Sequence, residues 1–160
     1  TLAQSVTFTG TVDMKSAITA VGYFDALYSS VEAKIANFTA AKNKTYVITK
    51  LDGCDVTLPA PTKGARIKLV FGGATSNNHT VTTNATSTLY NGYAFMQDTA
   101  DGTPAAFEVF APDGTDDDVI TLNRTTTGVA GIIELIGTAT NRWWVEAHLH
   151  SNGDAATPFA

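Results

Sequence analysis

The segment Gly128–Leu149, with the sequence GVAGIIELIGTATNRWWVEAHL, decides the fold that we expect for this chain. Its first half contains a compact apolar run that only Glu134 interrupts. Gly137–Asn141 then supplies turn residues, and Arg142–His148 alternates in character. Two extended runs around a loop that contains Gly and Asn predict a β-hairpin.

Trp143 and Trp144 are adjacent and are the only tryptophans in the chain. Neighbouring side chains on a strand point to opposite faces, so we expect one indole in the core and the other at a second surface. An aromatic side chain on an outer face is typical of a contact with another protein. As an alternative, aromatic rings could form a platform on which a sugar stacks. The rings considered for that platform are Trp143, Trp144, Tyr90, Tyr93 and Phe95.

The composition favours an assembling protein over a nucleic-acid or membrane protein. Only 16% of the 160 residues are charged, compared with about 25% in an ordinary soluble domain. A surface so poor in charge indicates that part of it is buried in an assembly. The net charge of −5 argues against a nucleic-acid partner, which selects a basic stripe. No apolar stretch reaches the roughly 20 residues of a membrane span, so no membrane partner is expected.

Residues 43–150 are expected to form a domain that is mainly β. Short apolar runs recur at regular spacing with turn signals between them, which predicts an antiparallel β-sandwich or barrel of jelly-roll-like type. Asn91-Gly92 predicts a tight turn, and residues 151–160 a loose tail. The strands predicted before the terminal hairpin are Thr45–Thr49, Asp55–Leu58, Arg66–Phe71, His79–Thr83, Ala106–Phe110 and Val119–Leu122.

Residues 1–42 are expected to form an N-terminal arm or anchoring segment. Val6, Phe8 and Val12 are spaced by Thr and Gly, which predicts an extended segment, either an edge strand or an arm that reaches a neighbour. Apolar residues at three- and four-residue steps predict one short helix over Asp25–Ala36. A six-residue cadence leaves open a β shaft instead of a helix over Ser16–Ala36.

Two segments carry a resemblance to a known group of proteins. They are TYVITKLDGCDVTLPAPTKGARIKLVFGG at Thr45–Gly73 and IIELIGTATNRWWVE at Ile132–Glu146. Together they resemble structural proteins of tailed bacteriophages, and the resemblance covers Phe38–Ala147. Its motifs are apolar patterns with turns and carry no chemical signature. The segment Ser5–Met14 is similar to segments of phage fibre shafts, whereas Ser16–Ala36 has no counterpart.

This resemblance implies a non-enzymatic component of the virion that is made in the host cytoplasm. The favoured role is a capsid decoration, or cement, protein that binds the major capsid protein or other virion proteins, usually as a homo-trimer. The alternative is a fibre-head or lectin-like domain that binds host glycans. The residues that we expect to make contacts are Val6, Phe8, Val12, Trp143 and Trp144.

No motif of catalysis or cofactor binding is present, so no catalytic residue and no cofactor are predicted. The chain lacks the nucleophile elbow G-x-S-x-G, the P-loop, H-E-x-x-H and C-x-x-C. Cys54, the single cysteine, allows no internal disulfide, and as a nucleophile it would need a base within hydrogen-bond reach. A glycan hydrolase would need two carboxylates across a groove, and nothing selects a pair. The carboxylates considered are Asp98, Asp101, Glu108 and Glu134.

Two groups of residues could bind a metal ion, although a simpler interpretation is favoured for both. His148 and His150 are two residues apart, so on a strand they share a face and could chelate a metal. The simpler interpretation is a pair of polar residues at a strand end. Asp113, together with Asp116–Asp118, could offer oxygens to calcium from a loop that contains Gly. The spacing does not match the twelve-residue calcium loop, so a solvated loop is expected.

Overall fold

The computed structural model describes residues 31–50, 52–72, 77–98, 107–123, 130–151 and 153–160. These residues are mainly β, and none of them lies in a helix. Eleven strands within the described residues form a seven-stranded sheet and a four-stranded sheet. Within the described ranges, no helix has the length and apolar character that a membrane crossing requires.

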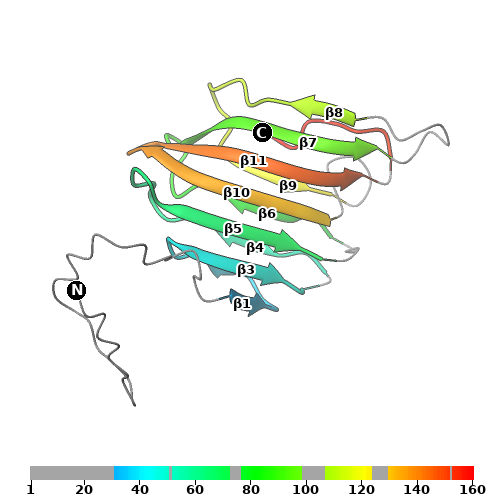
Figure 1. Cartoon of the computed structure of the whole chain (residues 1–160), viewed down its shortest axis with the longest axis horizontal. Helices are drawn as coiled ribbons and strands as arrows, with labels where there is room; N and C mark the ends of the chain where they lie inside the picture. The colour runs from blue at the N-terminus through cyan, green and yellow to red at the C-terminus, as the bar shows by residue number, and fades with distance from the viewer. Residues whose placement is uncertain (1–30, 51, 73–76, 99–106, 124–129, 152) are drawn as a thin grey trace, which may run out of the picture.

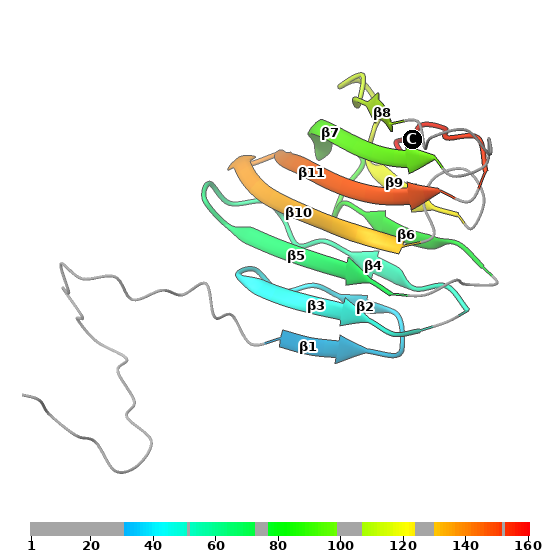
Figure 2. The same ribbon diagram turned by 45° about the vertical axis from the view of Figure 1, so that its right-hand side comes forward.

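The first six strands wind through the two sheets in turn (Figure 2). Odd-numbered strands pair in parallel in the larger sheet, and even-numbered strands pair in parallel in the smaller sheet. Parallel neighbours need a crossover connection, and here each crossover passes through a strand of the other sheet. The strands are β1 (Val31–Lys34), β2 (Phe38–Thr39), β3 (Lys44–Ile48), β4 (Asp55–Thr57), β5 (Arg66–Phe71) and β6 (His79–Thr82).

The predicted hairpin is confirmed and lies at the centre of the larger sheet (Figure 1). Its strands are β10 (Ala130–Ala139) and β11 (Arg142–Ser151). The hairpin separates β5 from β7 (Leu89–Asp98), which runs parallel to β11. The order of the larger sheet is β1-β3-β5-β10-β11-β7-β8, and that of the smaller sheet is β2-β4-β6-β9. The remaining strands are β8 (Phe107–Phe110) and β9 (Val119–Leu122).

The hydrophobic core takes side chains from both sheets. Alternate residues along each strand are buried, as the two-residue period of a strand requires. The Tyr90 hydroxyl of the larger sheet donates a hydrogen bond of 2.8 Å to the Val81 carbonyl of the smaller sheet. The largest fully buried side chains are Trp143, Tyr46, Tyr90, Ile48, Leu58, Ile67, Leu69, Met96, Ile120, Leu122, Ile133 and Leu135.

The prediction of antiparallel pairing is only partly confirmed, and the jelly-roll-like sandwich or barrel stays a prediction. Five of the nine strand pairings in the described part of the chain are parallel, and four are antiparallel. Alternation of apolar and polar residues predicts a half-buried strand equally well in either direction. The direction depends instead on the connection, and in the first six strands the connections cross to the other sheet.

Asn91 and Gly92 do not form the predicted turn, because both lie inside the continuous strand β7. Gly92 has a φ of +116° and is paired with Val145 of β11. Glycine adopts such a backbone conformation without steric cost and lets another backbone approach closely. The glycine that suggested a turn therefore permits close packing of two neighbouring strands.

The predicted helix over Asp25–Ala36 is wrong in its described half, because Val31–Lys34 forms strand β1. Residues 25–30, and with them most of Ser16–Ala36, lie outside the described residues. Val31 and Ile35 suggested a helical stripe, yet 67% and 79% of these side chains are exposed, so their spacing does not mark a buried face. Strand structure also begins before the predicted boundary at residue 42, since β1 and β2 pair with β3 and β4.

The C-terminal residues are not the loose tail that was predicted. Phe159 is buried and forms a β-bridge with Ile120 of β9. The Ala160 amide donates to the Val119 carbonyl at 3.0 Å, and the Val119 amide donates to the Ala160 carbonyl at 2.8 Å. The end of the chain therefore contributes both backbone pairing and an aromatic ring to the core.

Candidate interaction surface

The seven-stranded sheet has an outer face, turned away from the smaller sheet, that carries a continuous apolar row. Each member of this row pairs in register with the member on the next strand. Only one member, His148, is polar. The outer row consists of Ala33, Val47, Val70, Ile132, His148, Phe95 and Val109.

Trp144 lies on the same outer face, with 41% of its side chain exposed. Its indole meets the ring of Tyr93 edge-on, at 6.4 Å between centroids and an angle of 87°. Loss of hydration raises the pKa of Tyr93, and its hydrogen bond to the Glu146 carboxylate adds to this effect. Aromatic pairs of this geometry favour a fixed orientation, so the exposed indole is held in place by its neighbour.

A shallow depression of about 390 Å³ lies at one end of the outer row. The Phe95 ring lies 5.4 Å from the Phe107 ring and 6.1 Å from the His148 ring. Three rings and a few polar groups together can hold a ligand that offers both an apolar face and hydrogen-bonding edges. The depression is lined by Phe95, Gln97, Phe107, Ala130, Gly131, His148, Leu149 and His150.

An ion pair and a polar contact of His148 border the apolar row on the outer face. Lys68 Nζ contacts Glu134 Oε1 at 2.7 Å, across neighbouring strands. His148 Nε2 lies 3.4 Å from Glu146 Oε1. Exposed pairs of this kind add little to stability, but they give the apolar row a polar border, as in protein–protein interfaces.

The sequence-predicted contact residues are divided by the structure. Val6, Phe8 and Val12 lie outside the described residues. Trp143 is completely buried, and its Nε1 has no hydrogen-bond partner among the described residues. Trp143 therefore cannot contact a partner in this conformation, and Trp144 is the exposed indole. This division is the one predicted from the alternation of a strand.

The other aromatic residues of the predicted sugar platform are also divided. Tyr90 is buried in the core, where burial raises its pKa well above the usual value for tyrosine. Tyr93 and Phe95 are partly exposed on the outer face. Phe107, which is not among the rings of the predicted platform, adds a ring to this surface because β8 places it beside Phe95.

The two histidines considered as metal ligands lie together, whereas the described carboxylates considered for glycan hydrolysis do not. His148 and His150 share the outer face, and both line the depression. Glu108 and Glu134 lie on opposite faces of the larger sheet, since Glu108 pairs with buried Met96 and Glu134 with Lys68 of the outer face. The carboxylates of Glu108 and Glu134 cannot face one another across a groove. Asp101 and the side chain of Asp98 lie outside the described part of the chain.

In the acidic loop Asp113–Asp118, carboxylates accept hydrogen bonds from backbone amides of the same loop. Asp117 is buried and accepts hydrogen bonds from the amides of Asp113 and Gly114, the second at 3.1 Å. Asp113 accepts from the Thr115 hydroxyl at 2.6 Å and from its amide at 2.8 Å, which lowers the pKa of Asp113. Potential ligand atoms of Asp113, Asp116 and Asp117 lie within 4.8 Å of one another. These internal bonds account for the arrangement of the loop.

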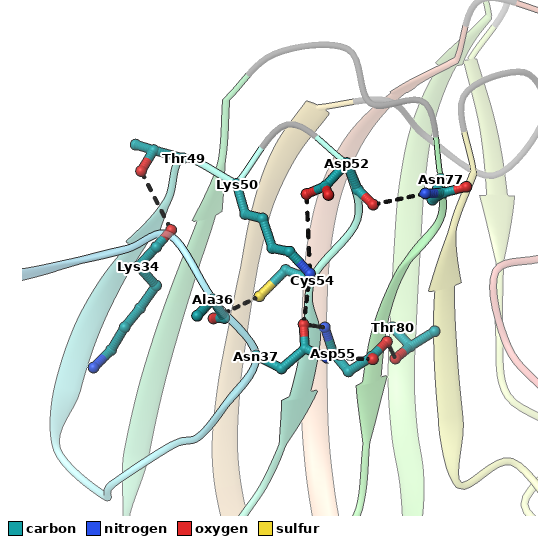
Figure 3. Close-up of polar contacts among 10 residues, drawn as sticks. All are labelled: Lys34, Ala36, Asn37, Thr49, Lys50, Asp52, Cys54, Asp55, Asn77 and Thr80. Carbon is teal, nitrogen blue, oxygen red and sulfur yellow. Dashed lines mark hydrogen bonds and ion pairs between the residues drawn. The ribbon is translucent and has the colours of Figure 1, made fainter.

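Cys54 is a buried structural thiol in this fold. Its Sγ donates to the Ala36 carbonyl at 3.4 Å (Figure 3), and burial raises the pKa of the thiol. His79 is also buried, and its ring lies 4.9 Å from the Phe71 ring. Desolvation lowers the pKa of His79, whose Nδ1 has no partner among the described residues. The hydrogen-bond partner of the Cys54 thiol is thus the Ala36 backbone carbonyl and not a histidine.

A polar ladder at the ends of the parallel strands keeps successive turns of the chain in register (Figure 3). Asn37 Nδ2 donates to Asp55 at 2.7 Å, and the Thr80 hydroxyl donates to the same carboxylate at 2.9 Å. Lys50 Nζ donates to Asn37 Oδ1 at 2.9 Å. Asn37, Asp55 and Thr80 lie at the starts of β2, β4 and β6, so these hydrogen bonds link three successive strands of the smaller sheet.

Sequence reasoning missed Phe107 and Val109 as surface residues. They alternate with Glu108 and Phe110, a pattern that equally predicts Phe107 and Val109 facing the core. In the structure they lie on the outer face of β8, an edge strand of the described sheet, where 61% and 60% of their side chains are exposed. Comparison of the chain with protein-family models, curated proteins and solved structures gave no match.

Proposed function

We propose that this chain is a non-enzymatic structural protein of a tailed-bacteriophage particle, and specifically a capsid decoration protein. The resemblance of Phe38–Ala147 to phage structural proteins supports the class. The observation that carries the proposal is the outer face, where Ile132 is exposed within the apolar row and Trp144 is exposed beside it.

The proposed mechanism is burial of the outer face against a shell protein. In this proposal the two sheets act as a β-sandwich: their inner faces form the core, which leaves the outer face free for a partner. A stable contact hides roughly 800 Å² on each partner. At about 25 cal/mol per Å² of apolar area, an exposed sheet face can supply the binding free energy after ordering costs. The Lys68–Glu134 pair forms part of the polar rim.

The test is attachment of the full-length protein to particles of the phage that encodes it. Trp144→Ala should weaken co-sedimentation with particles by at least tenfold, because an exposed tryptophan is a frequent hot spot. Thr57→Ala is the matched control, since Thr57 is exposed on the smaller sheet. If Trp144→Ala attaches like the unaltered protein, or if the chain is missing from purified particles, the proposal is wrong.

The predicted arm is tested in the same assay. Phe8→Asp places a charge in the alternating apolar segment of residues 1–15 and should weaken attachment if that segment contacts the shell. Thr7→Asp is the control, because Thr7 would point to the opposite side of an extended segment. Equal effects of the two substitutions would contradict a specific apolar contact.

A second candidate function, recognition of host glycans, is favoured by the aromatic depression. Sugars present apolar faces that stack on aromatic rings, and the Phe95, Phe107 and His148 rings lie together there. A glycan array screened with full-length protein should show binding that Phe107→Ala removes and Trp144→Ala keeps. No glycan binding, or equal loss in both variants, would reject this depression as a sugar site.

A further inference from the structure

Large exposed apolar side chains gather at the two opposite edges of the seven-stranded sheet. Among the described residues, six large hydrophobic side chains are exposed, and four of these lie on or beside the edge strands. Edge strands are usually protected by charge or covering segments, because they present unpaired backbone groups. The four residues are Val31 and Ile35 at the β1 edge and Phe107 and Val109 at the β8 edge.

Both edges also offer backbone hydrogen-bonding groups. Within the described residues, β1 pairs only with β3 and β8 only with β7. Each edge strand therefore has one side without a strand partner in the described part of the chain. A further strand placed there could pair with the backbone of the edge strand, as in β-augmentation.

The exposed apolar side chains of β1 and of β8 lie on the same face of the larger sheet. Val31 and Ala33 lie on the outer face, and so do Phe107 and Val109. Joining β1 to β8 would therefore place apolar side chains beside one another and extend the outer row from one molecule into the next.

The opposite face of the two edge strands is complementary in charge. Glu32 accepts hydrogen bonds from both Lys34 and Lys44, so this group of three carries a net positive charge. Glu108 lies on the corresponding face of β8 and has no ion-pair partner among the described residues. A β8 edge that approaches β1 would bring Glu108 toward the two lysines.

We propose that the β1 edge of one copy of this chain docks on the β8 edge of a second copy, so that the larger sheet continues across the contact. Two different surfaces meet, which makes the contact heterologous. Contacts of this kind close into rings when the rotation allows. This contact uses the backbone edges of β1 and β8, which border the outer face proposed for the shell partner, and its use does not depend on the virion assignment.

The first test is the solution mass of the 160-residue chain by light scattering over a range of concentrations. The unaltered chain should form species of two or more copies of 16.8 kDa. Val109→Lys should raise the dissociation constant at least tenfold by burying an unpaired charge. Trp144→Lys, on the outer face, should leave the mass unchanged. A monomer at all concentrations, or an oligomer that Val109→Lys does not weaken, would overturn the proposal.

The second test is a disulfide between the two edges in the variant Val31→Cys with Val109→Cys. Six strand spacings of about 4.8 Å separate these positions by roughly 29 Å within one molecule, whereas bridged cysteines need Cα atoms within about 7 Å. Any disulfide between them therefore links two copies. Mild oxidation and thiol blocking before denaturation should give covalent oligomers. Val31→Cys with Thr138→Cys is the control, because Thr138 lies at the exposed tip of the hairpin.

Other occupants of the β8 edge give different results. If Val109→Lys reduces attachment to particles while the solution mass stays unchanged, the edge binds another protein and self-docking is wrong. If the thiol introduced at position 109 is protected from labelling in a monomer, part of the same chain covers the edge, which also overturns the proposal. The outer-face proposal is judged separately by Trp144→Ala.

Discussion

The backbone of Val145 occupies the place where a side chain of Gly92 would lie. A Cβ added to Gly92 would lie 2.0 Å from the Val145 carbonyl oxygen. The two residues are partners in the parallel pairing of β7 with β11, beside the only two tryptophans of the chain. The close approach of β7 and β11 at this point therefore depends on a residue without a side chain.

Gly92→Ala is expected to lower the free energy of unfolding by several kcal/mol, because it adds a clash with backbone to an unfavourable φ of +116°. Gly64→Ala is the matched control for the φ alone: Gly64 has a φ of +83° and open space around its Cβ position. This control should cost only about 1 kcal/mol. Urea denaturation measures both, and equal losses would contradict the close approach.

The pH dependence of stability should contain a contribution from Glu32. Hydrogen bonds from Lys34, and then from Lys44, lower the pKa of Glu32 from 4.5 to about 2. A carboxylate whose pKa is depressed in the folded state adds stability above its unfolded pKa and loses it as the pH falls through the folded value. The loss attributable to Glu32 should therefore occur as the pH falls from about 4.5 to about 2.

Glu32→Gln tests this expectation, since it removes the titrating group and keeps the shape. Urea denaturation between pH 2 and pH 7 should show a smaller decrease in stability toward acid in the variant than in the unaltered chain. Glu134→Gln is the control for an exposed pair on the outer face. An unchanged acid dependence in Glu32→Gln would contradict the role assigned to the two lysines.

Cys54 should be unreactive toward a thiol reagent in the native protein. Its side chain is fully buried, and burial raises its pKa, so neither access nor thiolate is available. The reagent should react at once in denaturant. Thr57→Cys adds an exposed thiol on β4 and should react rapidly without denaturant. Rapid labelling of Cys54 in the native chain would show that residues around Ala36 open readily.

Phe159→Ala should destabilise the protein by about 3 kcal/mol, the lower part of the range for a buried phenylalanine. The ring is 6% exposed and lies 6.5 Å from the Tyr90 ring, in the core cluster. Asp154→Ala, at an exposed position, should change stability by no more than about 0.5 kcal/mol. Thermal unfolding measures both, and a neutral Phe159→Ala would restore the prediction of a loose tail.

Much of the fold follows from local pattern. The strand at Arg66–Phe71, the strand at Val119–Leu122 and the central hairpin lie where alternation and turn residues predict them. The burial of Trp143 and the exposure of Trp144 follow from the two-residue period of a strand. The helix at Val31–Ala36 and the turn at Asn91-Gly92 are wrong, because apolar spacing and a turn-prone pair each fit two conformations.

The candidate surface was only partly predictable. The sequence predicted that one of the two adjacent tryptophans is exposed, because neighbouring side chains on a strand point to opposite faces. The structure shows that this residue is Trp144. The exposure of Phe107 and Val109 could not be predicted, since an alternating strand has an apolar face whether that face meets a core or solvent.

By itself, the sequence determined that this chain forms short strands, that a tryptophan pair straddles one of them, and that no motif of catalysis is present. These properties follow from local periodicity and from residue types. Only the tertiary structure decided that the described strands pair in both parallel and antiparallel directions, that β1 and β8 form the edges of the larger sheet among them, and that Phe159 joins the core. These features join residues far apart in the chain, and no local pattern specifies which distant partner a strand will meet.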